Sequence, residues 1–444
     1  MMKEKIKKIY NKILERKLLK NFLMIFTGQG ISSVFGLFAT IIIISAIGSE
    51  QHGILIVIQT YSTLFYSFFS FKTFQALIKY LAQAKKENET ENIKIYIKWS
   101  FLLDLLSLLL MFVFGIVLKN LVISWMNWPT NITKYLMIYL ALQIFYIQGT
   151  TIGVLRSYEK YNYVVTSQII SNLVRFALYL YCYLSKSSFD TFFLAEVIAT
   201  FVNYILLIYY TVKVLRENKL LDFYKVKLKY KKEFFMFNIY SNLTSTLDLP
   251  INQVTQLIIN KYLGFSANSA YNVFEKLGTV INKLGDPINQ IIYPEMNLKI
   301  VDKDYDGARD LSKKLKKLML GIFAVCFVGT LLTYKLWFHL FIDDVDLYII
   351  PFCLYLAFIS YSNAAMGTHN LFMALGYVKY NIPILIIVNS IYLVFLFFAI
   401  QNLGLSGVLL AYLIQAMGMV VIKEIILKKH RYMEYVDKKG VKNA

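Results

Sequence analysis

Residues 382–400 read IPILIIVNSIYLVFLFFAI and residues 406–422 read SGVLLAYLIQAMGMVVI, with only QNLGL between them. Each run is apolar and long enough to cross a bilayer, since a spanning helix takes about 20 mostly apolar residues. The short connection predicts a helical hairpin in a membrane. The whole sequence agrees, because 57% of its 444 residues are hydrophobic and 17% are charged, against roughly a quarter charged in soluble domains.

Twelve such runs can be marked, and they predict an all-α, polytopic membrane protein with two six-helix lobes around a central cavity. The predicted spans are 22–47, 54–82, 97–119, 133–155, 161–184, 190–212, 234–261, 267–297, 317–341, 347–375, 379–401 and 405–427. The predicted organisation is an interfacial amphipathic helix at 1–21, an N-terminal lobe at 22–212, a basic linker at 213–233, a C-terminal lobe at 234–427 and a tail at 428–444.

The distribution of basic residues predicts the orientation of the chain. Of the 47 lysines and arginines, 37 fall in the two ends and in every second loop, 5 in the opposite loops and 5 in the spans. Basic loops stay on the cytoplasmic side during insertion, so both ends are predicted to be cytoplasmic. The net charge of +20 is then a property of these loops and gives no reason to expect nucleic acid.

Several kinds of chemistry are missing from the sequence. It has no GxxxxGK[ST] phosphate loop and no HExxH motif, so neither ATP hydrolysis nor a zinc peptidase site is expected. The three cysteines lie in predicted spans and form no disulfide framework. We therefore expect a non-enzyme without cofactor or metal.

Polar side chains recur at helical spacing in the first, second, seventh and eighth predicted spans, as in Asn238, Ser241, Ser245 and Asp248. Cavity-lining helices carry such stripes, whereas lipid-facing helices are apolar all round. Hydrogen bonding between packed helices is the alternative for any single polar residue. Taken together, the stripes favour a cavity.

Four basic residues in the spans, Lys72, Arg175, Lys276 and Lys283, are predicted to form an anion seat. A cation at the bilayer centre costs about 2.5 to 3.5 kcal/mol on insertion scales, which implies a wet or ligand-filled interior. Pairing with carboxylates is the alternative for each. The acidic residues Asp104, Glu196, Asp248 and Glu275 are candidates for ion coupling.

Several segments carry a resemblance to a known family when taken in order. They are KNFLMIFTGQGISSVFGLF at 20–38, IGSEQHGIL at 47–55, DLPINQVTQLIINKYLGFSANSAYNVFEKLGTVIN at 248–282, the pair Tyr293 and Pro294, LFMALG at 371–376 and GLSGVLLAYLIQ at 404–415. With these, the chain resembles Wzx-type polysaccharide flippases of the multidrug/oligosaccharidyl-lipid/polysaccharide exporter superfamily. It departs from many relatives at SFKTFQALIKY, residues 70–80, where they have an Asp and a Gly before an Arg.

The resemblance implies flipping of undecaprenyl-diphosphate-linked oligosaccharide repeat units for O-antigen or capsule, by alternating access between the lobes. The implied partners are the bilayer, that lipid-linked substrate, H⁺ or Na⁺ as candidate coupling ions, a glycan polymerase and a chain-length regulator. The diphosphate would suit Lys72, Arg175, Lys276 and Lys283, and the same cavity is expected to present Asn242, Gln256 and Asn282. The alternatives are a cation-coupled multidrug exporter of the superfamily and a membrane glycan polymerase or ligase.

Overall fold

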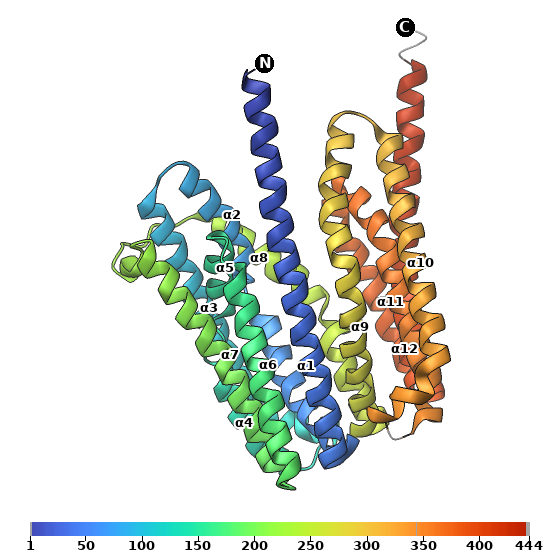
Figure 1. Ribbon diagram of the computed structural model, residues 1–444. Helices are drawn as coiled ribbons and strands as arrows, with labels where there is room; N and C mark the ends of the chain where they lie inside the picture. Colours follow the sequence, from blue (N-terminus) through green and yellow to red (C-terminus); the bar gives the residue numbers. More distant parts are fainter. Residues whose placement is uncertain (1, 343, 441–444) are drawn as a thin grey trace. The chain divides into compact units, whose positions relative to one another are not determined.

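The computed structural model describes the backbone of residues 2–342 and 344–440, and within these residues all regular secondary structure is helical. The predicted all-α class is therefore confirmed. The chain divides into two compact units, unit 1 from Met1 to Leu249 and unit 2 from Pro250 to Ala444. Figure 1 shows that the longer helices of unit 1 lie side by side along a common direction, as do those of unit 2.

The helices of unit 1 are α1 (Met2–Phe69), α2 (Thr73–Lys86), α3 (Thr90–Met126), α4 (Ile132–Gln143), α5 (Gln148–Ser157), α6 (Tyr161–Leu184), α7 (Phe189–Glu217), the 3-10 helix η1 (Leu221–Tyr224) and α8 (Lys232–Leu247). Those of unit 2 are the π-helix η2 (Pro250–Val254), α9 (Thr255–Val301), α10 (Tyr305–Trp337), the 3-10 helix η3 (Phe338–Leu340), α11 (Val345–Ala374), the 3-10 helix η4 (Tyr377–Tyr380) and α12 (Asn381–Gly440).

The predicted spans lie mainly in helix, although 54–82 is interrupted at residues 70–72 and 133–155 at residues 144–147. Within the described residues, seven helical segments are long and apolar enough to cross a membrane. The segment in α12 covers nearly all of two predicted spans, and the segment in α1 covers most of the first span and the second as far as Phe69. Helices α6 and α9 are not among these seven segments, because polar side chains such as Arg175 and Glu275 lower the mean hydropathy of their sequences. Large apolar side chains stand out from the helices, as in Val117, Leu184 and Leu332, which are 68%, 71% and 79% exposed. Such a surface is stable in lipid.

Single glycines make the sharp turns inside three of the long helices. Gly48 interrupts α1 with φ 80° and ψ 165°, and Gly264 interrupts α9 with φ 85° and ψ −179°. This region of φ and ψ is essentially restricted to glycine. Gly404 breaks α12 with φ 57° and ψ −137°. Gly48 lies between the first and second predicted spans and Gly264 between the seventh and eighth, so these two glycines occupy equivalent places in the two units.

The start of the chain is continuous with the first span. The helix runs from Met2 through the predicted boundary at residue 21 and has no non-helical residue before Gly48. The placement of residues 1–21 on a membrane surface stays a prediction.

The division between the units falls within the seventh predicted span. Helix α8 ends there at Leu247, and the π-helix η2 begins at Pro250. Phe234, at the start of α8, is fully buried in a cluster with Ala76, Tyr80 and Leu103 of α2 and α3. This aromatic packing explains why α8 groups with unit 1. The lobe boundaries predicted from the linker stay a prediction.

Candidate functional site

Unit 1 contains an interrupted helix at Lys72. The chain leaves helical geometry after Phe69 and resumes at Thr73, and Lys72 takes the left-handed conformation with φ 49° and ψ 40°. A non-glycine residue is uncommon in this region of φ and ψ. Asn242 of α8 stabilises the break, since its amide donates to the carbonyl oxygens of Phe68 at 3.0 Å and Ser70 at 2.7 Å.

A second interruption lies between α4 and α5, and one carboxylate joins the two. Asp104 of α3 accepts a hydrogen bond from the Thr73 hydroxyl at 2.6 Å, where α2 begins. It also accepts from the backbone N–H of Thr150 at 2.6 Å and from the hydroxyl of the same residue at 2.8 Å, where α5 begins. The first turns of both half-helices therefore converge on Asp104.

This arrangement is favourable because the N-terminus of a helix carries partial positive charge and unpaired N–H groups. Asp104 is only 6% exposed, and in the described part of the chain its partners are neutral threonines. Close packing makes the contact possible: a Cβ added to Gly149 would lie 1.9 Å from Thr73 Oγ1 and 2.5 Å from Asp104 Oδ1. Glycine is therefore required beside the carboxylate.

Among the predicted cations whose side chains the structure describes, Lys72 is available for a ligand. Its side chain is partly buried, and among the described residues it makes no ion pair and no side-chain hydrogen bond. Lys72 is the N-cap residue of α2 and lies within the predicted span 54–82. A partly buried, uncompensated cation at a helix N-terminus is suited to an anion.

Arg175, by contrast, is already paired in unit 1. Its guanidinium donates to both carboxylate oxygens of Glu196, at 2.7 Å and 3.0 Å, and it also bonds Asn172. Glu196 accepts further hydrogen bonds from Tyr179 at 2.8 Å and from Gln59 at 3.0 Å. This buried network joins α1, α6 and α7, and it is the carboxylate pairing that the sequence left open as an alternative.

Unit 2 contains a cavity of about 180 Å³, lined by Ile251, Tyr271, Glu275, Asn282, Tyr355, Phe358, Ile359, Ser362 and Tyr412. Gln256 donates to the Glu275 carboxylate. The hydroxyls of Tyr271 and Tyr412 lie 2.7 Å apart, and Tyr412 donates to the carbonyl oxygen of Ile251 at 2.5 Å. The structure therefore brings together Gln256 of the seventh predicted span with Glu275 and Asn282 of the eighth.

Lys276, Asp248 and Lys283 are further residues that the sequence predicted for the site. The side chains of Lys276 and Asp248 are partly buried, and neither lines that cavity. The side chain of Lys283 lies outside the described residues. Across the described residues, no group of three or more His, Cys, Asp or Glu side chains is arranged to hold a metal ion.

One buried cation, Lys423, is not among the site residues that the sequence predicted. Lys423 of α12 is 6% exposed, and its Nζ lies 3.0 Å from Nδ1 of His369 in α11. The charge count groups Lys423 with the basic residues of the cytoplasmic C-terminal end, because it follows the last apolar run. Its burial depends on the packing of α11 against α12, which no local pattern reveals.

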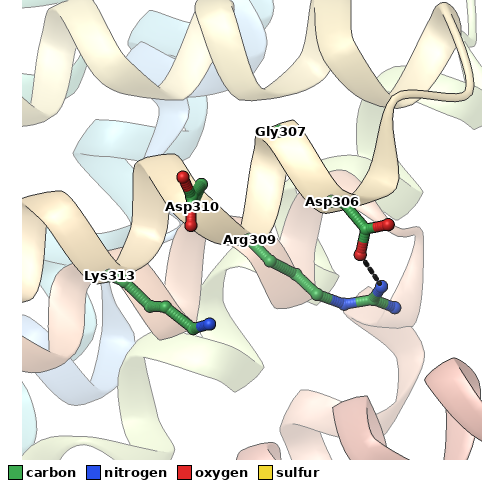
Figure 2. A pocket seen from close by; sticks show the side chains of 5 residues that line it. All are labelled: Asp306, Gly307, Arg309, Asp310 and Lys313. Atoms are coloured by element: carbon green, nitrogen blue, oxygen red, sulfur yellow. Dashed lines mark hydrogen bonds and ion pairs between the residues drawn. The ribbon is translucent and has the colours of Figure 1, made fainter.

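A further hollow lies on the surface at the first turns of α10, lined by Asp306, Gly307, Arg309, Asp310 and Lys313. Figure 2 shows the ion pair between Asp306 and Arg309, with Asp310 and Lys313 further along the same helix. All five residues come from one helix, and their charges are mixed. This hollow is therefore a weaker candidate than the Lys72 break or the Glu275 cavity.

Comparisons with known proteins agree with this membrane-transporter architecture. The fold is similar to that of a multidrug resistance MATE family transporter of the MOP superfamily, solved in an inward-facing conformation, with a TM-score of 0.72 at 12% identity over 92% of this chain and 96% of that one. A mutant of the Vibrio cholerae MATE transporter VcmN matches with a TM-score of 0.58 at 14% identity, over 94% of this chain and 97% of that one.

The family follows from sequence. Residues 18–297 match the polysaccharide biosynthesis protein family, and the chain belongs to that family. Inner membrane protein YghQ of Escherichia coli (strain K12) is 20% identical over 289 residues, which are 63% of this chain and 80% of that protein. The chain is therefore a multi-pass membrane protein of a polysaccharide biosynthesis family with a transporter fold, as the sequence resemblance predicts.

Proposed function

We propose that this protein flips an undecaprenyl-diphosphate-linked oligosaccharide repeat unit across the bacterial inner membrane, for O-antigen, capsule or a similar surface glycan. The family supports a role in polysaccharide biosynthesis, and the fold supports transport by alternating access. A lipid carrier would keep its chain in the bilayer while its anionic headgroup passes through the protein.

Lys72 is the observation that carries the proposal. A diphosphate needs charge-assisted hydrogen bonds when it leaves water, and the Lys72 ammonium is partly buried and unpaired among the described residues. It also adjoins the N-terminus of α2, whose partial positive charge favours an anion. Lys276, Lys283 and the paired Arg175 stay proposed members of this seat, with Asn242, Gln256 and Asn282 as its polar contacts.

The test uses the full chain in liposomes with a fluorescent undecaprenyl-diphosphate-linked N-acetylglucosamine as the probe. We expect Lys72→Gln to reduce the flipping rate by about tenfold or more, equivalent to one lost charge-assisted bond of about 1.5 to 3 kcal/mol. Lys72→Arg should retain most of the rate. Lys186→Gln, at an exposed lysine, is the matched control. Equal rates in all three variants would exclude Lys72 from the seat.

Among the proposed coupling residues, Glu275 has the best support because it lines a cavity with tyrosine hydroxyls around it. Asp104 and Glu196 are engaged in hydrogen bonds within unit 1, and Asp248 adjoins the π-helix η2. We infer that Glu275 binds H⁺ or Na⁺ during transport. In liposomes with an imposed ion gradient, Glu275→Gln should lose the dependence of flipping on that gradient.

A cation-coupled drug exporter is the second candidate, favoured by the MATE fold and by the Glu275 carboxylate in an aromatic cavity. Deletion of the gene separates the two functions. Loss of surface glycan with unchanged drug susceptibility supports the flippase. Unchanged glycan with greater drug sensitivity supports the exporter.

A further inference from the structure

The linker between α7 and α8 contains an extended basic segment. Residues 225–232 read KVKLKYKK, with five lysines and no acidic residue. Residues 225–231 form neither helix nor strand in the structure. We call residues 225–232 the basic ribbon.

The basic ribbon follows a fixed course along the first turns of α3. The Lys98 ammonium donates to the carbonyl oxygens of Tyr224 at 2.7 Å and Val226 at 2.8 Å. The indole N–H of Trp99 donates to the carbonyl oxygen of Lys229 at 3.0 Å. Because side chains of α3 bind its backbone, the ribbon presents a defined face.

The side chains on that face have the composition of a membrane interface. Tyr224 is 61% exposed, Leu228 41% and Tyr230 71%. The lysines at positions 225, 227 and 232 are exposed and form no ion pair with any described residue. Lysine with tyrosine and leucine beside the ends of spanning helices is typical of segments that lie at the lipid headgroups.

We propose that the basic ribbon binds anionic phospholipid headgroups of the leaflet that it faces. Its charge complements such a leaflet, whose negative surface potential attracts basic segments within about 10 Å. The exposed tyrosines and Leu228 favour a lipid surface over a soluble acidic protein, because they gain by entering the headgroup layer. This role concerns the bulk lipids and is separate from transport of the glycan carrier.

Trp99 provides the probe, since its indole touches the ribbon. The full chain carrying Trp125→Phe, Trp128→Phe and Trp337→Phe is placed in phosphatidylcholine nanodiscs with a small fraction of brominated phosphatidylglycerol or brominated phosphatidylcholine. We expect the brominated phosphatidylglycerol to quench Trp99 at least about twofold more strongly at equal mole fraction, and 0.5 M NaCl to remove the difference.

Two triple variants form the matched pair. Changing Lys225, Lys227 and Lys232 to Gln should abolish the difference between the two lipids. Changing Lys119, Lys134 and Lys186 to Gln, at positions predicted on the opposite membrane face, should leave it intact. Equal quenching by both lipids in the parent chain, or an undiminished difference in the ribbon variant, overturns the proposal.

Native mass spectrometry of the unmodified sequence gives an independent measurement if the tryptophan substitutions prevent folding. The wild-type protein should retain more phosphatidylglycerol than the ribbon variant after mild delipidation. Equal retention by the two chains would overturn the proposal as well.

Discussion

Asp104 in α3 holds Thr150 in α5 through two hydrogen bonds, from the backbone N–H at 2.6 Å and from the hydroxyl at 2.8 Å. Its other oxygen accepts from the Thr73 hydroxyl at 2.6 Å. Three helices are joined at one buried carboxylate, beside the break that presents Lys72. Asp104 is therefore best understood as a residue that positions the broken helices.

Removing the Asp104 carboxylate should destabilise the protein in a graded way. Asp104→Ala leaves the Thr150 N–H buried without an acceptor and should cost about 2 to 3 kcal/mol. Asp104→Asn should cost about 1 kcal/mol, because its oxygen can still accept from Thr150 while the Thr73 hydroxyl rotates to accept from its amide. Thermal unfolding in detergent measures both.

Ser107→Ala is the control for these variants, since Ser107 is buried in the same helix and, among the described residues, donates to the Leu103 carbonyl one turn earlier. It should unfold close to wild type. If Asp104→Ala unfolds at the same temperature as Ser107→Ala, the carboxylate does not hold the helices.

Gly149→Ala should also disrupt the contact of α2, α3 and α5 at Asp104, through steric overlap. The new Cβ would lie 1.9 Å from Thr73 Oγ1 and 2.5 Å from Asp104 Oδ1, and overpacking of this kind costs about 1 to 3 kcal/mol. Gly30→Ala in α1 is the comparison, since nothing lies within 4 Å of its added Cβ. That change should leave the unfolding temperature unchanged or raised, and equal destabilisation by the two would count against the contact at Asp104.

The sequence predicts the twelve spans because the apolar content of a membrane helix is a local property. It also predicts the turns at Gly48 and Gly264, which lie between apolar runs. It does not predict the breaks after Phe69 and Gln143, because no Pro or Gly occurs in Ser70–Lys72 or at 144–147. Those breaks depend on hydrogen bonds that Asn242 donates and Asp104 accepts, and both residues belong to other helices.

The candidate site, like the fold, was predictable from the sequence only in part. Polar residues recur at helical spacing in the eighth predicted span, which contains Glu275 and Asn282, and both line the cavity of unit 2. Spacing could not show that Arg175 faces Glu196, because the pair joins α6 to α7 and depends on how these helices pack. The burial of Lys423 beside His369 likewise depends on how α11 packs against α12.

Breaking the pair of Arg175 and Glu196 should be costly in each single variant. Arg175→Ala or Glu196→Ala leaves one uncompensated buried charge, at a cost of about 3 to 5 kcal/mol. The double alanine variant should be less destabilised than the sum of the singles, because no lone charge remains. Chemical unfolding of the four proteins in mild detergent measures the coupling, and additive costs would argue against a structural pair.

Gly48 and Gly264 should respond alike to substitution. Each has the backbone geometry that other residues adopt at a cost of about 1 to 3 kcal/mol. Gly48→Ala and Gly264→Ala should therefore lower the unfolding temperature by similar amounts, although open space surrounds both added Cβ atoms. Gly321→Ala in α10, which also meets open space, is the control. A loss confined to one of the two glycines would contradict their structural equivalence.

The docking of the linker should depend on pH through Asp222. The Lys94 ammonium donates to this carboxylate at 2.7 Å and holds the pKa of Asp222 below its ordinary value, which is about 3.9. A carboxyl with a lowered folded-state pKa stabilises the docked linker above that ordinary value, and the contribution disappears as the pH falls through the lowered pKa.

Hydrogen exchange at the amides of Phe223 and Lys225, which bond Leu220 and Asp222 in the docked linker, reports this change. After correction for intrinsic rates, their protection should fall between pH 6 and pH 3 in the wild type. Asp222→Asn should show low protection at both values, since it cannot form the ion pair. A wild-type decrease that persists unchanged in Asp222→Asn would assign the pH dependence to another group, because only the carboxylate of Asp222 titrates against Lys94 at this contact.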